Sequence, residues 1–228
     1  MEIGRQQRLE EQGFLLCDLK ELISEPLYRE IKEITPKIKE KEQSKENMYF
    51  RGDYFITNKD GRVVPRGFTH PWNEIPEKLN DNKIDWSQKF WEYTRPSVEI
   101  KHKFDEISFN IINQCYTSEK YTDWFDIFKS RGLFTLFEEG NLIKEHRDGR
   151  NPGRICALMI YLNENWKEND GGELVLIDKQ GEKQIITPKY GNIVILDFTK
   201  EDNNLSHEVL RVNGEFKRWT YLHFVTLK

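Results

Sequence analysis

From Leu133 onward the sequence is divided into short apolar segments by closely spaced turn signals. The turns carry glycine within two positions of asparagine, aspartate or lysine, as in Asn151-Pro-Gly and Asp170-Gly-Gly, a pattern typical of connections between short strands. We predict eight strands, at residues 133–138, 142–147, 154–162, 173–178, 182–187, 192–198, 207–211 and 217–226. Eight such strands, preceded by helices, favour a double-sheet jelly roll over a parallel sheet.

The residues before this region are predicted to support it. Residues 1–12 fit a short helix or a frayed end, and Gly13 to Cys17 fit a short buried strand. Helices are expected at residues 19–23 after a cap at Asp18, at 26–47 with an interruption near Pro36, from Ser97 to about 112, and from 117 to 132. The predicted fold class is therefore α+β, with a double-stranded β-helix (jelly-roll, cupin-like) core and supporting N-terminal helices.

Residues 48–56 alternate aromatic and polar side chains and lead through Asn58-Lys-Asp-Gly61 to a second short strand at 62–64. We interpret this hairpin as an edge of the sheet. The alternative is that aromatic side chains on loops within residues 48–75 contact a substrate. The following segment, to about Pro96, is rich in Pro, Asn, Asp and Trp and is predicted to loop over the surface.

The length of 228 residues is enough for one good-sized core. We predict a single domain over residues 1–228, with helices, edge strands and loops in 1–132 and the jelly-roll core in 133–228. The net charge of -4 and a pI near 5.9 give no general reason to bind nucleic acid. The sequence also shows no apolar signal region at its amino terminus and no run of about twenty apolar residues for a membrane span.

The three cysteines, Cys17, Cys115 and Cys156, are odd in number and far apart in apolar surroundings. We interpret them as reduced thiols in or near the core, which predicts a cytoplasmic protein.

Three residues of the predicted core have the character of metal ligands. His146 and Asp148 are two positions apart, so that on a strand their side chains point the same way. His207 follows about sixty residues later, at the start of another apolar strand. Two imidazoles and one carboxylate suit a non-haem Fe(II) with open coordination positions. Taken alone, His-x-Asp is more often a surface pair and a strand histidine more often structural; His223 is interpreted as structural.

These residues belong to a longer ordered pattern. It runs Phe137-Glu-Glu-Gly140, His146-Arg-Asp148, Tyr161-Leu-Asn163, Asp170-Gly-Gly-Glu-Leu174, Pro188-Lys-Tyr-Gly191, His207-Glu-Val209 and Arg218. Over residues 133–226 this pattern resembles the prolyl 4-hydroxylase-like branch of the 2-oxoglutarate- and Fe(II)-dependent dioxygenases. The first part of the chain matches only through a short strand and helices of the kind that brace such cores.

The resemblance implies roles for particular residues. His146, Asp148 and His207 would bind the iron, and Arg218 would pair with the distal carboxylate of 2-oxoglutarate. The cofactor residues implied are Arg218, Tyr161, Met159 and Leu174, of which Met159 and Leu174 also fit ordinary core positions. Alternation supports this set, because Met159 and Tyr161 share one strand face.

Two features near the pattern bear on ligand binding. Many family members have tyrosine at the position of Phe137, so this chain lacks that hydroxyl. Arg150 and Arg154 could read a substrate charge at the mouth of the site, although solvation at the surface is the favoured interpretation for both. The Gly171-Gly172 pair predicts a tight turn with close backbone approach.

The resemblance implies a hydroxylase that uses Fe(II), 2-oxoglutarate and O2, with ascorbate as a further candidate cofactor, and that releases succinate and CO2. The leading hypothesis for the substrate is a prolyl residue of a peptide or protein. The alternatives are a free amino acid or other small molecule, a metal-binding cupin or isomerase without 2-oxoglutarate, a nucleic-acid demethylase and a catalytically silent interaction domain. An intact metal and co-substrate set that includes Arg218 disfavours the cupin or isomerase and the silent domain, and the acidic balance disfavours the demethylase. The free amino acid or other small molecule stays open as a substrate.

Overall fold

The computed structural model describes residues 4–40, 48–57, 60–71, 84–93, 97–116, 131–148 and 153–226. All eight strands predicted for the core are present, with ends that agree within two residues. They are β5 (Arg131–Phe137), β6 (Leu142–His146), β7 (Arg154–Tyr161), β8 (Leu174–Ile177), β9 (Lys183–Ile186), β10 (Asn192–Asp197), β11 (Ser206–Val209) and β12 (Arg218–Thr226).

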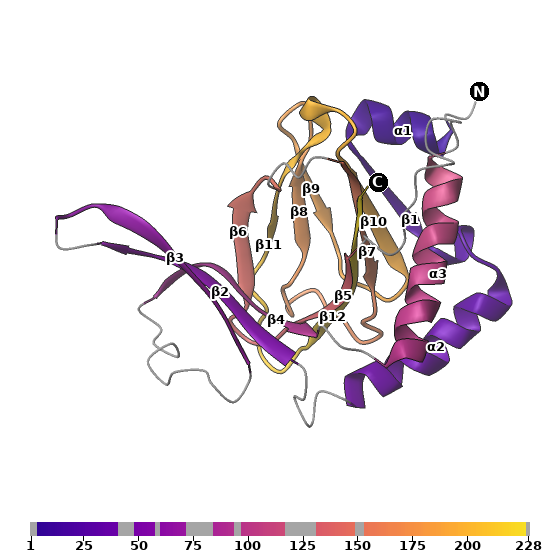
Figure 1. Cartoon of the computed structure of the whole chain (residues 1–228), viewed down its shortest axis with the longest axis horizontal. Coiled ribbons are helices and arrows are strands. Elements are labelled where there is room, and N and C mark those ends of the chain that lie inside the picture. The colour runs from indigo at the N-terminus through magenta and orange to yellow at the C-terminus, as the bar shows by residue number, and fades with distance from the viewer. Residues whose placement is uncertain are drawn as a thin grey trace.

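These strands form one curled antiparallel sheet with two halves. One half has the order β10-β7-β12-β5 and the other has the order β6-β11-β8-β9. Each half therefore interleaves strands that are distant in sequence, and the two halves face each other across an interior, as Figure 1 shows. This arrangement confirms the predicted double-stranded β-helix within an α+β fold.

Strand β4 (Asp85–Tyr93) joins the two halves, because it pairs with β5 at one end and with β6 at the other. We predicted a surface loop for this segment, which was wrong. Charged residues at Asp85, Lys89 and Glu92 lower its strand propensity, but pairing with strands distant in sequence outweighs that propensity. Residues 76–83 and 94–96 of the same predicted loop lie outside the described residues.

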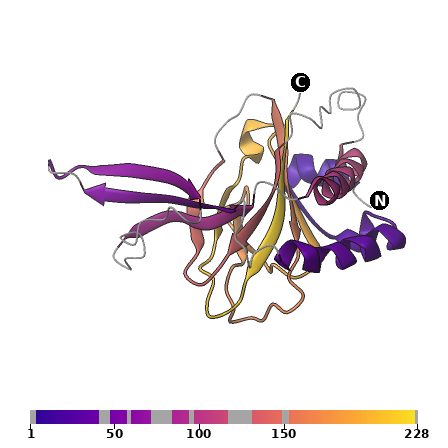
Figure 2. The same cartoon turned by 60° about the horizontal axis from the view of Figure 1, so that its bottom comes forward.

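The hairpin predicted next to it is present and longer than expected. Strand β2 (Met48–Thr57) pairs with β3 (Val63–Pro71) along its whole length and also with β4. Together β2 and β3 project from the core as an arm, visible at the left of Figures 1 and 2. The structural interpretation of the hairpin as a sheet edge is thus confirmed.

Three helices lie together on one side of the sheet (Figure 1): α1 (Arg5–Gln12), α2 (Glu25–Glu40) and α3 (Val98–Cys115). Ser97 caps α3 by accepting a hydrogen bond from the backbone N–H of Ile100, as predicted. Helix α3 buries Phe104 against Phe134 and Tyr221, with ring centroids 5.0 and 4.8 Å apart. The helices therefore shield the outer face of the sheet and leave its inner face for a second apolar cluster inside the jelly roll.

The remaining N-terminal elements extend that layer. Strand β1 (Phe14–Asp18) pairs with β10 at the edge of the sheet. Asp18 caps the next segment by accepting from the Lys20 N–H, but that segment is a single 3-10 turn, Leu19–Glu21, and not the predicted helix. Helix α2 continues through Pro36 to Glu40. Residues 41–47 and 117–130, part of two predicted helices, lie outside the described residues.

The three cysteines are free thiols, with Cys115 and Cys156 buried and Cys17 half-buried. Burial raises the pKa of Cys17 to about 12 and that of Cys115 to about 11, so both stay protonated near neutral pH. Within the described part of the chain, no helix combines the length and the apolar character needed to cross a membrane.

Candidate metal centre and adjoining cavity

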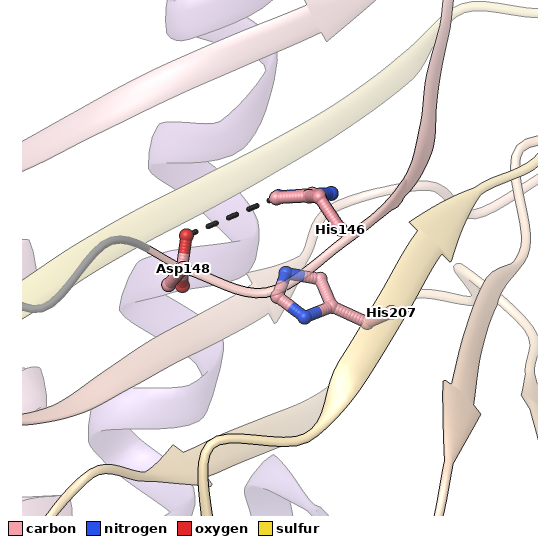
Figure 3. Close-up of side chains that lie close together, drawn as sticks. All are labelled: His146, Asp148 and His207. Atoms are coloured by element: carbon pink, nitrogen blue, oxygen red, sulfur yellow. Dashed lines mark ion pairs between the residues drawn. The ribbon is translucent and has the colours of Figure 1, made fainter.

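The three candidate ligands meet at one end of the jelly roll. His146 ends β6 and lies directly opposite His207 on β11, and Asp148 follows two residues beyond His146. One ligand atom from each residue lies within 4.8 Å of the others. The His146 Nε2 atom is 3.9 Å from Asp148 Oδ1, and the two imidazole centroids are 4.4 Å apart. Figure 3 shows the three side chains gathered in this way.

Backbone hydrogen bonds fix which imidazole nitrogen is free. The His146 Nδ1 lies 2.9 Å from the Lys144 carbonyl oxygen, and the His207 Nδ1 lies 3.1 Å from that of Leu205. Because a carbonyl only accepts, each Nδ1 must donate, which leaves each Nε2 with a lone pair for a metal ion. Asn204 also donates to the Asp148 carbonyl at 2.9 Å and holds the backbone of the third ligand.

The burial of His207 favours its neutral form. Desolvation lowers the pKa of His207, although the Asp148 carboxylate opposes this shift and His146 reinforces it. A neutral imidazole is the form that binds a metal. Two such imidazoles and one carboxylate fit Fe(II) by the chemistry of the donors.

A cavity of about 730 Å³ adjoins these ligands. Met159 and Leu174, two of the predicted cofactor residues, lie in its wall beside Ala157 and Leu196. All four are apolar and at most 8% exposed. The cavity is therefore lined at this side by the apolar inner face of the jelly roll.

Arg218 and Tyr161 lie on neighbouring strands of the same inner face. Arg218 is 2% exposed, donates from Nε to the Gly172 carbonyl at 2.6 Å and from Nη1 to the Thr220 hydroxyl at 2.9 Å. It forms no salt bridge with a carboxylate among the described residues. The buried Tyr161 hydroxyl, beside it, finds no hydrogen-bond acceptor there either.

A buried guanidinium without a carboxylate partner costs free energy of folding. Both groups are buried, and this burial lowers the pKa of Arg218 and raises that of Tyr161. A carboxylate would satisfy the guanidinium and the orphan hydroxyl together. Arg218 shares its strand face with Leu222 and Phe224, which line the cavity, so the pair fits the distal carboxylate of a ligand that enters there.

The Gly171-Gly172 turn shows the close backbone approach that the sequence predicted. Both glycines have positive φ, 69° and 76°. A Cβ on Gly171 would lie 2.0 Å from the Arg211 carbonyl oxygen, and one on Gly172 would lie 2.8 Å from Arg218 Cδ. The turn therefore allows β12 and its arginine to lie directly against the loop before β8.

Other site residues were not predicted. Arg51, Gln88, Phe90 and Glu92, from β2 and β4, also line the cavity. No local pattern in the sequence indicates them, because their place in the cavity depends on the pairing of β2 and β4 with strands distant in sequence. Phe137, noted for its missing hydroxyl, stacks on Phe90 and lies 4.9 Å from the Arg218 guanidinium carbon.

Arg154 lies at the wall of the cavity. Arg154 was expected to be solvated, which was wrong: it is half-buried, lies 4.1 Å from the Phe224 ring centroid and lines the cavity. The neighbouring Phe224 ring gives its long side chain an apolar surface to cover. Arg150 lies outside the described residues.

His223 is buried on the opposite face of the sheet, against Tyr221, which confirms a structural position.

The fold and the site together define a class. They describe a double-stranded β-helix protein with a two-histidine, one-carboxylate centre that lines a cavity, and with a buried arginine on the same inner face. The family model described as the 2OG-Fe(II) oxygenase superfamily matches residues 132–226, the segment that holds the three metal donors and Arg218. The jelly-roll segment of the chain is thus similar to this superfamily. None of the curated proteins matches the sequence significantly.

Solved structures with the same fold include prolyl hydroxylases at low identity. A Pseudomonas putida prolyl-4-hydroxylase is 16% identical, with 96% of this chain and 95% of that chain covered and a TM-score of 0.59. A Trichoplax adhaerens prolyl hydroxylase in complex with a hypoxia inducible factor oxygen degradation domain peptide is 15% identical, with 96% and 86% covered and a TM-score of 0.60. The viral collagen prolyl hydroxylase of Paramecium Bursaria Chlorella virus-1, as a 2OG complex, is 14% identical, with 95% and 97% covered and a TM-score of 0.51.

Proposed function

We propose that this protein is a hydroxylase that uses Fe(II), 2-oxoglutarate and O2 and acts on a prolyl residue of a peptide or protein. One observation carries the proposal: the three metal donors line a cavity on the inner face of one jelly roll, and Arg218, a buried guanidinium with no carboxylate partner among the described residues, lies on that same face. A metal-binding cupin without 2-oxoglutarate has no use for a buried guanidinium that lacks a carboxylate.

Each part of the site has a defined task in this proposal. His146, Asp148 and His207 would hold the iron on one face, and Arg218 with Tyr161 would bind the distal carboxylate of 2-oxoglutarate. The iron with 2-oxoglutarate and O2 supplies the oxidising chemistry that inserts one oxygen atom into a carbon–hydrogen bond and releases succinate and CO2. Met159 and Leu174 keep water from this region, because both are apolar and buried in the cavity wall.

The arm supports a peptide as substrate. Arg51, Gln88 and Glu92 of β2 and β4 give the cavity a polar border at the base of the projecting hairpin. An extended border of this kind offers hydrogen bonds to a peptide backbone over several residues. The Trichoplax adhaerens neighbour, similar in fold, is in complex with a peptide fragment.

A small molecule is the second candidate substrate, and the charges of the cavity favour it. Arg147 and Arg154 both line the cavity near the metal donors. Two guanidinium groups would suit the carboxylate of a free amino acid. The arm and the cavity border extend beyond what such a molecule needs, so we rank the peptide first.

The first experiment measures succinate formation by the metal-stripped protein after addition of Fe(II), 2-oxoglutarate, O2 and ascorbate. The assay is run alone, with a pool of proline-containing peptides, and with a pool of free amino acids. His146→Ala and Arg218→Ala run in parallel, and His102→Ala, at an exposed position on α3, is the matched control.

Succinate that depends on His146 and Arg218 but not on His102, and a peptide product heavier by one oxygen on proline, would support the proposal. Stimulation by free amino acids with no modified peptide would replace the peptide by the small-molecule substrate. Absence of succinate, together with no binding of 2-oxoglutarate to the metal-loaded protein, would overturn the proposed activity.

A further inference from the structure

Phe90 lies where β4 changes its pairing partner. Strand β4 pairs with β5 from Trp91 to Tyr93 and with β6 at Gln88 and Lys89. Phe90, between these two stretches, is 6% exposed and lines the cavity. The Phe90 ring therefore lies where the two halves of the jelly roll meet. Phe90 is outside residues 132–226, the segment that the family model matches.

One face of this ring is stacked on the wall beside Arg218. The rings of Phe90 and Phe137 are nearly parallel, at an interplanar angle of 4° with centroids 5.0 Å apart. Phe137 is directly opposite Arg218 in the β5–β12 pair, and the Arg218 guanidinium carbon is 4.9 Å from its ring centroid. On the other neighbouring strand the same carbon is 5.1 Å from the Tyr161 ring centroid. The guanidinium is thus flanked by two rings, one of which is backed by Phe90.

Phe90 is also held from the arm. Arg51 is directly opposite Phe90 in the β2–β4 pair, with its guanidinium carbon 5.9 Å from the Phe90 ring centroid. Arg51 Nη1 is in turn 3.2 Å from Glu92 Oε1, and the Glu92 side chain is 7% exposed. This ion pair lies along β4 beside the ring, so Phe90 is fixed on both sides and has little room to turn.

We infer that Phe90 is a positioning residue for 2-oxoglutarate, because its stack on Phe137 holds the Arg218 guanidinium in line for the distal carboxylate. The inference rests on the assignment of Arg218 under the proposed function. Phe137 has no hydroxyl to bond a ligand, so its contribution is the position of its ring. Without Phe90 the Phe137 ring loses its backing, and a small rotation would move the planar fork away from the carboxylate.

The test is the affinity of the full chain for 2-oxoglutarate, measured by calorimetry on Mn(II)-loaded protein without O2. Phe90→Leu removes the ring but keeps an apolar side chain, whereas Phe90→Tyr keeps the ring. Phe50→Leu is the matched control, because Phe50 is equally buried on the adjacent strand β2 but packs on Trp91, in the cluster between sheet and helices. The affinity for Mn(II) and the midpoint of thermal unfolding are measured for every variant.

We expect Phe90→Leu to weaken 2-oxoglutarate binding by roughly tenfold, with Mn(II) affinity unchanged, and Phe90→Tyr to restore most of it. Phe50→Leu should lower the unfolding midpoint as much as Phe90→Leu and leave 2-oxoglutarate affinity unchanged. Equal affinity in Phe90→Leu and the parent, or equal loss in Phe50→Leu, would overturn the inference alone. A parent protein that binds no 2-oxoglutarate would overturn the proposed function as well.

Discussion

Gly172, in the loop before β8, lies in direct contact with Arg218, the first residue of β12. The Gly172 carbonyl accepts a hydrogen bond from Arg218 Nε at 2.6 Å, and a Cβ on Gly172 would lie 2.8 Å from Arg218 Cδ. Gly172 thus accepts a hydrogen bond from the Arg218 guanidinium and, because it has no side chain, leaves room for the aliphatic part of Arg218. The position of the Arg218 side chain depends on the absence of a side chain forty-six residues earlier.

Gly172→Ala should therefore weaken the binding of 2-oxoglutarate by at least roughly tenfold, because Arg218 must shift to admit the methyl group. The measurement is calorimetry with the metal-loaded protein. Gly181→Ala is the control: its φ of +83° gives a similar backbone strain, but a Cβ there meets nothing within 4 Å. Equal losses in the two variants would show that backbone strain, and not contact with Arg218, is responsible.

Metal binding should stabilise the fold through the two paired histidines. At a hundredfold excess of ion over its dissociation constant, linkage predicts a gain of about 2.7 kcal/mol in the free energy of unfolding. Urea unfolding of the metal-stripped protein, with and without Mn(II), measures this gain. The gain should disappear in His207→Ala and persist in His102→Ala. A gain that survives in His207→Ala would place the ion elsewhere.

Asn163 is predicted to be a major contributor to stability. Its side-chain amide donates to the carbonyls of Pro188 and Trp219, at 2.8 and 3.0 Å, and its oxygen accepts from the Trp219 N–H at 2.7 Å. Asn163→Ala leaves buried backbone groups unsatisfied and should cost about 3 kcal/mol in urea unfolding. The exposed Asn213, which donates to the Asn169 carbonyl, serves as control. Asn213→Ala should cost less than about 0.5 kcal/mol.

His223 should make stability depend on pH. Burial lowers its pKa to about 4 from an ordinary value of 6.5, while Asp105 opposes the shift and Lys101 reinforces it. Since the folded pKa is the lower one, the unfolded chain binds the proton more readily. The stabilisation is complete above about pH 6.5 and is lost progressively as the pH falls toward 4.

The corresponding experiment compares the parent with His223→Gln in urea at pH 7 and pH 5. Between these values the parent should lose about 2 kcal/mol more unfolding free energy than the variant, which lacks the titrating group. Carboxylates that titrate in the same range are common to both proteins and cancel in the difference. Identical pH dependence in the two proteins would contradict the assignment.

The sequence was informative where turn residues and alternation determine structure locally. The glycine-containing turns located all eight core strands, and alternation placed Met159 and Tyr161 on one face and His223 opposite Arg218. The His-x-Asp spacing and the later His207 suggested a single cluster, and the structure brings these residues together.

The sequence was uninformative where a position depends on distant partners. Strand β4 has charged residues and loop-like flanks, and it is a strand because β2, β5 and β6 pair with it. Phe90 and the cavity position of Arg154 follow from that tertiary arrangement, and no local period predicts them. The contact between Gly172 and Arg218 likewise requires knowledge of which loop faces β12.

The pairing of β1 with β10 has a consequence for the behaviour of the chain in solution. Strand β10 is a run of buried apolar residues, Ile193 to Leu196, and β1 covers its outer edge from Phe14 to Asp18. Without that cover, β10 would offer open backbone donors and acceptors along an apolar strand, which is a template for pairing between molecules. The five residues of β1 therefore occupy backbone groups of β10 that could otherwise pair with another molecule.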